Sequence, residues 1–220
     1  MKEIETTAKT TDEAVELALR ELDADRADVE IDVVSRGKAG LFGIGGEPAR
    51  VRVTLLEAPN EVVSATTDVL TNLLSKMGVS AMANLRQVHS EELDGPVFEV
   101  EGEDSGLLIG RRGETLRALQ FLVKYIASKR VETRVNVMVD VEGYQERRYK
   151  SLTGLAERVA QNVVRSDRSI TLEPMPANER RVVHMALSEH RQVATESMGT
   201  GDSRQVVIYL KEQEQPETLP

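Results

Sequence analysis

The sequence predicts an α+β protein made of three small domains, each with helices packed on a small sheet. Short segments in which apolar and polar residues alternate indicate half-buried strands, and longer segments with apolar residues three and four positions apart indicate helices. The length of 220 residues allows one to three domains. The domains are predicted at residues 1–57, 61–143 and 144–212, followed by a disordered tail at residues 213–220.

The first domain is predicted to have the element order β-α-β-β. Thr10 and Glu13 have the spacing of a helix-capping box, and apolar residues follow them at helical intervals. A glycine-rich loop at residues 36–48 separates the last two strands, and residues 57–60 have the composition of a linker. The strands are expected at residues 2–6, 29–33 and 49–55.

The second domain is predicted to have the order α-β-β-α-α-β. Its elements are expected at residues 62–77, 79–89, 96–100, 104–108, 113–128 and 134–140. The third domain is predicted to begin with a long helix, which leads through a short extended piece to a second helix and a pair of strands. These elements are expected at residues 144–165, 170–172, 177–189, 193–197 and 204–210.

The composition argues against several classes of chemistry. The absence of cysteine removes disulfides, thiolate catalysis and cysteine-ligated metals, and it fits a reducing cytoplasm. The three histidines lack metal-binding spacing, and no nucleophile–base pair is evident. No apolar segment approaches the roughly 20 residues of a membrane span, and the N-terminus lacks the pattern of a secretory signal. We therefore expect a cytoplasmic protein that is not an enzyme and uses no cofactor and no metal.

The charge is unevenly distributed along the chain. The net charge is -9, which by itself argues against nucleic-acid binding. Residues 106–134, however, contain seven basic and only two acidic residues, whereas residues 1–60 contain eight basic and thirteen acidic ones. A basic island in an acidic chain therefore indicates where an anionic partner would bind.

Two glycines, Gly110 and Gly113, enclose Arg111 and Arg112 within this basic segment. The Gly-x-x-Gly spacing occurs four times in the chain, but only this copy lies between two predicted helices and contains arginines. Glycine lets a nucleic-acid backbone approach closely, the N-terminus of the next helix favours phosphate, and the arginines add charge-assisted hydrogen bonds. The alternative is an ordinary helix–helix turn with exposed arginines.

The segment from Gly106 to Leu116 resembles the signature loop of KH domains, and the preceding helix and strand imply the type II topology. In that family the loop clamps four nucleotides of single-stranded RNA. The resemblance implies RNA contacts for Ile109, Gly110, Arg111, Arg112, Gly113 and Arg117. An apolar groove beside the loop is expected from Leu107, Leu108, Ile109, Val135 and Val137.

Arg180 and His184 are four residues apart, so that both lie on one face of a predicted helix. Taken alone, this pattern favours a solvated basic helix with an incidental histidine. Together with residues 195–199 and 204–208, however, residues 175–184 resemble the Arg-xxx-His domain, a family that binds single-stranded nucleic acid. The resemblance implies RNA contacts for Arg180 and His184, and Arg181 and Arg204 are weaker candidates on the basis of their charge.

Residues 37–46 form the glycine-rich loop of the first domain. The loop leads to Pro48 and an alternating strand instead of a helix, so it does not fit a nucleotide-binding loop. It resembles the Lys-x-Gly-x-x-Gly-x-Gly loop of Jag N-terminal domains and is interpreted as a surface for a protein partner. The candidate partner-binding residues are Lys38, Gly40, Phe42, Gly43 and Gly45.

Three resemblances in this order, over nearly the whole chain, identify a member of the Jag/KhpB family. Membership implies a cytoplasmic protein that binds single-stranded RNA, acting as an RNA chaperone or post-transcriptional regulator linked to cell shape and cell-wall control. It also implies the small KH protein KhpA as a candidate partner, with self-association as an alternative. Many relatives have a longer charged linker after the first domain, which is almost absent here.

A second hypothesis remains open at this stage. The acidic first domain could dock a partner at the membrane insertase, in which case the protein is an adaptor and its RNA binding is vestigial. Under either hypothesis we expect the first domain to add little to RNA affinity, because an acidic surface repels phosphate.

Overall fold

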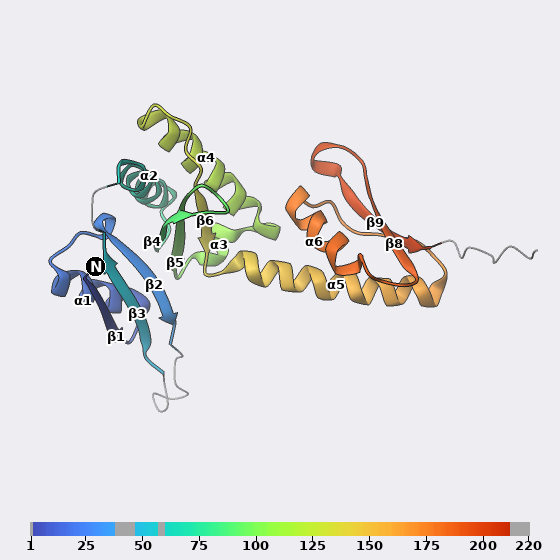
Figure 1. Cartoon of the computed structure of the whole chain (residues 1–220), viewed down its shortest axis with the longest axis horizontal. Helices are drawn as coiled ribbons and strands as arrows, with labels where there is room; N and C mark the ends of the chain where they lie inside the picture. Colours follow the sequence, from blue (N-terminus) through green and yellow to red (C-terminus); the bar gives the residue numbers. More distant parts are fainter. Residues whose placement is uncertain (1, 38–46, 57–59, 212–220) are drawn as a thin grey trace, which may run out of the picture. The chain divides into compact units, whose positions relative to one another are not determined.

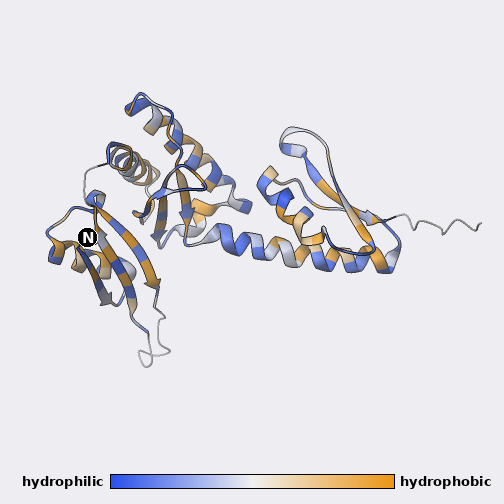
Figure 2. Ribbon diagram, viewed as in Figure 1, coloured by the Kyte–Doolittle hydropathy of each residue, from blue (hydrophilic) through white to orange (hydrophobic). Residues whose placement is uncertain are grey.

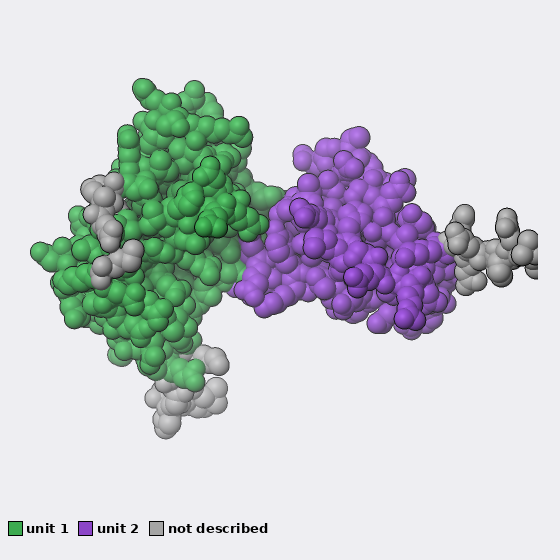
Figure 3. Space-filling view, viewed as in Figure 1, with its two compact units in different colours: residues 1–144 green, residues 145–220 purple. Residues whose placement is uncertain are grey.

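A computed structural model of the chain describes residues 2–37, 47–56 and 60–211 (Figure 1). The chain divides into two compact units, residues 1–144 and 145–220 (Figure 3). The described residues form three separate three-stranded sheets, each with helices, so the predicted α+β class is confirmed. The predicted tail at residues 213–220 lies outside the described residues.

The first sheet of unit 1 has the predicted order β-α-β-β. Its strands β1 (Glu3–Ala8), β2 (Val29–Ser35) and β3 (Ala49–Leu55) are antiparallel, with β3 in the centre. Helix α1 (Thr11–Leu22) packs against β1 and β3, and the short helix η1 (Arg26–Asp28) precedes β2. Apolar and polar residues alternate along these strands (Figure 2). Thr10 caps α1 by accepting a hydrogen bond from the Glu13 backbone N–H at 3.2 Å, as the capping-box spacing predicts.

The second sheet of unit 1 has the strand order β4-β5-β6. Strands β4 (Ala81–Ser90) and β5 (Gly95–Gly102) are antiparallel, and β6 (Met138–Val141) pairs with β5 in parallel. Helices α2 (Glu61–Met77) and α4 (Glu114–Arg130) pack against the sheet and against each other. The short helices α3 (Ser105–Ile109) and η2 (Arg111–Gly113) come directly before α4. The predicted order α-β-β-α-α-β is therefore confirmed.

The strand predicted at residues 134–140 begins only at Met138. The carbonyl group of Asn136 lies so close to Gly95 that a Cβ atom there would collide with it, and the two segments do not form a ladder at this point. Val135 and Val137 are nevertheless buried in the core. Their alternation therefore reports burial on one side and not strand pairing.

Unit 2 contains the third sheet, in which β9 (Gln205–Leu210) lies between β7 (Ile170–Thr171) and β8 (Val193–Met198). Helix α5 (Tyr144–Ser166) and helix α6 (Ala177–Leu187) contribute one face each to the core, and η3 (Gly201–Ser203) connects β8 to β9. The fully buried residues of this core include Leu152, Ala160, Val183, Val206 and Ile208.

Each of the three sheets has its own cluster of buried apolar residues. This supports the predicted division into domains at residues 1–57, 61–143 and 144–212, which we retain as a proposal. Among the described helices, we find none that combines the length and the apolar character needed to cross a membrane.

Candidate nucleic-acid interface

The loop from Gly110 to Gly113 connects α3 to α4 and has an unusual backbone. Three of its residues have positive φ: 66° at Gly110, 53° at Arg112 and 73° at Gly113. Neighbouring side chains also leave no space for a Cβ atom at either glycine. A Cβ atom at Gly110 would collide with Thr115, and one at Gly113 would lie 2.7 Å from Cε1 of Tyr144. The fold of the loop itself therefore depends on the two glycines.

The two arginines of this loop differ in their surroundings. Arg111 is exposed at the turn, whereas Arg112 is half-buried and has the left-handed conformation that non-glycine residues rarely adopt. The Nη1 atom of Arg117 donates a hydrogen bond of 2.9 Å to the carbonyl oxygen of Arg112. Arg117 thus helps to hold the loop in a conformation that costs free energy, which is a pattern typical of functional sites.

The prediction of an apolar groove beside the loop is wrong for three of its five residues. Leu108, Val135 and Val137 are buried in the core of the second sheet, so they cannot line an open surface. Ile109 is half-buried against the same core, while Leu107 is 67% exposed. Only Leu107 and Ile109 of the five predicted residues therefore present an apolar surface next to the loop.

The other basic residues of α4 lie along its surface. Lys124 donates to the side chain of Asn136 at 2.9 Å, and Lys129 lies 5.9 Å from the ring centroid of Tyr125. Arg130 forms an ion pair with Asp68 of α2 at 3.4 Å. The basic island predicted from the sequence is thus real, but several of its charges are engaged by neighbouring side chains.

In unit 2, Arg180 and His184 lie one turn apart on α6, as their spacing predicts. Arg180 donates from Nη1 to the carbonyl oxygen of Met175 at 2.7 Å. The ring nitrogens of His184 lie 2.7 Å from the Thr195 hydroxyl and 2.8 Å from the Ser197 hydroxyl, both on β8. His184 therefore connects α6 to the sheet.

Arg181 and Arg204, the two weaker candidates of unit 2, are both exposed. The backbone of Arg204 is fixed at both of its polar groups, since its N–H donates to Gly201 and its carbonyl accepts from Met175. Met175 consequently joins Arg180 to the segment that contains Arg204. The four predicted residues of this unit thus divide into two that are tied to the fold and two that reach into solvent.

Burial lowers the pKa of His184, and the positive charge of Arg180 lowers it further. A group whose pKa is lower in the folded chain binds fewer protons there than in the unfolded chain. The stabilising contribution of neutral His184 is therefore present above the ordinary histidine pKa of about 6.5 and is lost as the pH falls below it.

We expect the free energy of unfolding to decrease as the pH falls below the ordinary histidine pKa of about 6.5, and His184→Gln to reduce this pH dependence. The reason is that glutamine can replace one of the two hydroxyl contacts without taking up a proton. Urea denaturation at several pH values measures the effect, with His89→Gln on the exposed β4 histidine as the control. An unchanged pH dependence in His184→Gln would show that another group is responsible.

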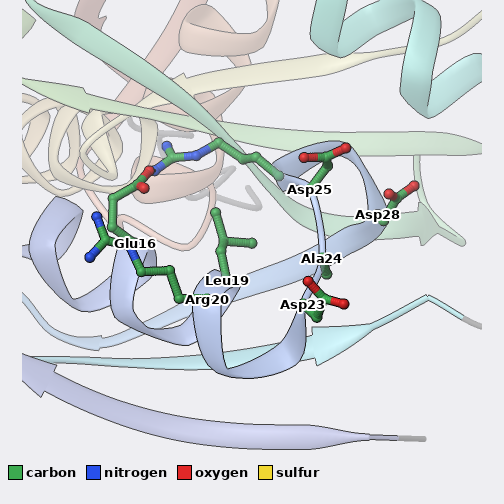
Figure 4. Close-up of a pocket in the computed structure, with 8 residues that line it drawn as sticks. Glu16, Leu19, Arg20, Asp23, Ala24, Asp25 and Asp28 are labelled. Carbon is green, nitrogen blue, oxygen red and sulfur yellow. The ribbon is translucent and has the colours of Figure 1, made fainter.

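The candidate residues of the first glycine-rich loop, Lys38, Gly40, Phe42, Gly43 and Gly45, lie outside the described residues. Elsewhere in this part of the chain, α1 and η1 border an open hollow of about 610 Å³ (Figure 4). Four of its eight lining residues are acidic, namely Glu16, Asp23, Asp25 and Asp28. The hollow is also lined by Arg20 and Arg26, but its acidic residues are in excess, which makes it unsuitable for phosphate. Among the described residues, no cluster of three or more acidic or histidine side chains is placed to hold a metal ion.

Comparisons with known families agree with the three sheets. A model described as the Jag N-terminus matches residues 6–55, and one described as the KH domain of KhpA/KhpB matches residues 67–139. A third model, that of the Arg-xxx-His domain, matches residues 150–210. RNA-binding protein KhpB of Clostridium symbiosum is 36% identical over 215 residues, which cover 96% of this chain and 93% of the relative.

The chain belongs to the KhpB family. RNA-binding protein KhpB of Bacillus subtilis is 35% identical over 96% of this chain and 100% of its own length. The KhpB protein of Lactiplantibacillus plantarum is 33% identical over 70% of this chain and 47% of the relative. The family predicted from the three motifs is confirmed, and each of the three motifs lies within the family model that corresponds to it.

Some residues that shape the KhpB-type loop were not predicted from the sequence. Tyr144 packs against Gly113, and Glu99 accepts a hydrogen bond from the Gly143 backbone N–H at 2.6 Å. Glu99 alternates with apolar residues in β5 and therefore has the pattern of an ordinary solvent-facing position. No local signal distinguishes it, because what covers the polar face of a sheet depends on the rest of the fold.

Proposed function

We propose that this chain binds single-stranded RNA. The loop at Gly110–Gly113 is the observation that carries the proposal: it presents Arg111 at the N-terminus of α4, a helix of 17 residues. A helix N-terminus attracts anions through its backbone N–H groups and its dipole, and a nearby guanidinium strengthens the attraction to phosphate. The RNA contacts proposed for this loop involve Ile109, Gly110, Arg111, Arg112 and Gly113, with Arg117 holding it in place.

We also propose a second contact surface for RNA in unit 2, where the exposed guanidinium groups of Arg181 and Arg204 would bind phosphate. Arg180 and His184 would position this surface, because both are hydrogen-bonded within the unit. The names of the KhpB relatives and the match to an Arg-xxx-His domain support this assignment.

The net charge of -9 does not oppose RNA binding, because the acidic residues are concentrated elsewhere. Residues 1–60 have an excess of five negative charges, whereas residues 106–134 have an excess of five positive ones. Interactions between exposed charges more than about 8 Å apart are largely screened at physiological ionic strength, so the charge close to the loop matters more for phosphate binding than the net charge of the chain.

We propose that the protein acts in the cytoplasm as an RNA chaperone or post-transcriptional regulator and is a binding protein with no catalytic role. Its family membership supports this proposal, and the link to cell shape and cell-wall control comes from the same source. The sequence of RNA crosslinked to the protein in cells tests it. Recovery of specific transcripts is expected. Recovery of background RNA only, together with co-purification of a membrane insertase, would favour the adaptor hypothesis instead.

We further propose a protein partner for the exposed apolar face of α4. Phe121 and Tyr125 are 68% and 56% exposed, and their rings stack with centroids 6.3 Å apart. Such a patch is unusual on a surface that has no partner. The match to a family model shared by KhpA and KhpB favours KhpA, with a second copy of this chain as the alternative. Light scattering of the chain alone and mixed with KhpA distinguishes the two.

A further inference from the structure

The second sheet in unit 1 bears two buried carboxylates that the proposed RNA contacts do not use. Glu99 and Glu101 are two residues apart on β5, and their side chains are only 5% and 6% exposed. One oxygen of each has no hydrogen-bond partner among the described residues. Buried carboxylates are costly unless a cation compensates them, so the source of the compensating charge matters.

Arg36, at the end of the first sheet, supplies most of that charge. Its Nε atom donates to Glu101 at 2.9 Å and its Nη2 atom donates to Glu99 at 3.0 Å. A further cation, Arg86, lies 3.6 Å from the second oxygen of Glu99 and is 56% exposed. The segment before β2 adds another contact, in which Arg26 donates to the buried Asn84 of β4.

The same oxygen of Glu99 that accepts from Arg36 also accepts from the Gly143 backbone N–H. Glu142 and Gly143 have φ values of 50° and 67°, so this turn needs contacts to hold it. The next residue, Tyr144, packs against Gly113 of the candidate RNA loop. A continuous set of contacts therefore runs from Arg36 through Glu99 and the turn to the loop.

We propose that Glu99 and Tyr144 are positioning residues of the Gly110–Gly113 loop and that Arg36 of the N-terminal segment controls them. Docking of the first sheet would then favour the loop conformation that binds RNA. This inference rests on the proposed function. It also differs from the expectation, drawn from the sequence, that the acidic first domain adds little to RNA affinity.

The physical reason lies in the charge of Glu99. An ionised carboxylate accepts a stronger hydrogen bond from a backbone N–H than a neutral one does. Burial raises the pKa of Glu99, the neighbouring Asp140 raises it further, and Arg36, Arg86 and the Gly143 N–H oppose them. Without Arg36 the carboxyl takes up a proton more readily, which loosens its hold on the turn before Tyr144.

Arg36→Met and Tyr144→Leu test the inference in the full-length chain. Each is expected to lower the affinity for a short single-stranded RNA about fivefold to tenfold, within the usual range of coupling between sites. The double variant should lose less than the product of the two single losses, because both act through the same turn. Arg52→Met is the matched control, since Arg52 pairs with Glu3 and Glu5 of the same sheet.

Arg36→Met combined with Glu99→Gln and Glu101→Gln removes the buried charges together with their cation. This triple variant should fold even where Arg36→Met does not. Its RNA affinity should be reduced about as much as that of Tyr144→Leu, because the neutral amide introduced at position 99 accepts only a weak hydrogen bond from the Gly143 N–H. Hydrogen exchange at the Gly113 and Gly143 amides should be faster in each affected variant and unchanged in Arg52→Met.

Charge reversal at Arg111 and Arg112, measured in parallel, distinguishes a wrong RNA site from a wrong coupling between Arg36 and that site. If the reversed loop binds RNA normally, the proposed RNA site is wrong. If the reversed loop loses RNA while Arg36→Met, the triple variant and Tyr144→Leu bind like the native chain, the RNA site stands and the inferred coupling is wrong. Independent, multiplicative losses in the double variant would likewise overturn the coupling.

Discussion

Replacing Arg111 and Arg112 together by aspartate is expected to lower the affinity for single-stranded RNA by about a hundredfold or more. The change replaces two positive charges by two negative ones at the N-terminus of α4, where the proposed phosphates lie. If two phosphate contacts are lost, the slope of log affinity against log salt should fall by about 1.4. Gel shifts at several salt concentrations measure both effects.

The fold should tolerate this change. Aspartate adopts the left-handed conformation of Arg112 more readily than most residues, and both glycines of the loop are retained. The control is Lys9→Asp with Lys76→Asp, which alters the net charge equally at two exposed positions outside the loop. An equal loss of affinity in this control would mean that the net charge of the protein, and not the loop, determines binding.

The largest effect on stability is expected in unit 2, where Arg148 forms a two-pronged ion pair with Glu179. Its Nε and Nη2 atoms donate to the two carboxylate oxygens at 3.1 and 2.8 Å. The side chain of Glu179 is only 5% exposed. Arg148→Leu leaves this buried carboxylate without its cation and should destabilise the unit by about 3–5 kcal/mol, as the removal of one partner from a buried pair does.

Urea denaturation of the full-length chain measures this destabilisation. Lys150→Leu is a matched control on the same helix, because Lys150 pairs with Glu146 at a site where both side chains are more than 70% exposed. A surface pair of this kind contributes less than about 1 kcal/mol. Similar losses in the two variants would show that the Arg148–Glu179 pair has no special role in stability.

The order of the helices and strands could be predicted because apolar periodicity reports which side of each segment is buried. The caps behave in the same way: the spacing of Thr10 and Glu13 correctly marks the start of α1. The method is weaker at Val135 and Val137, where the alternation is real but the segment has no strand partner. Burial and backbone pairing have the same signature in a sequence.

The contacts that fix the loop could not be predicted for a different reason. Glu99, Glu101 and Arg36 are each ordinary polar residues in alternating or loop segments, and 63 and 65 positions separate the arginine from its two carboxylates. Periodicity states that one face of a strand is polar but does not state what will cover it. The bond from Arg117 to the Arg112 carbonyl is equally hidden, because its charge alone resembles that of any solvated arginine.

The two glycines of the RNA loop have a consequence for interpreting related chains. Gly110 and Gly113 are each adjacent to side chains of the protein itself, Thr115 and Tyr144, which leave no room for a Cβ atom. A descendant that had abandoned RNA would still need both glycines to fold, whereas nothing in the packing would require it to keep Arg111. When related loops are compared, the glycine spacing therefore indicates common ancestry, and the residues between the glycines indicate more directly whether the loop still binds RNA.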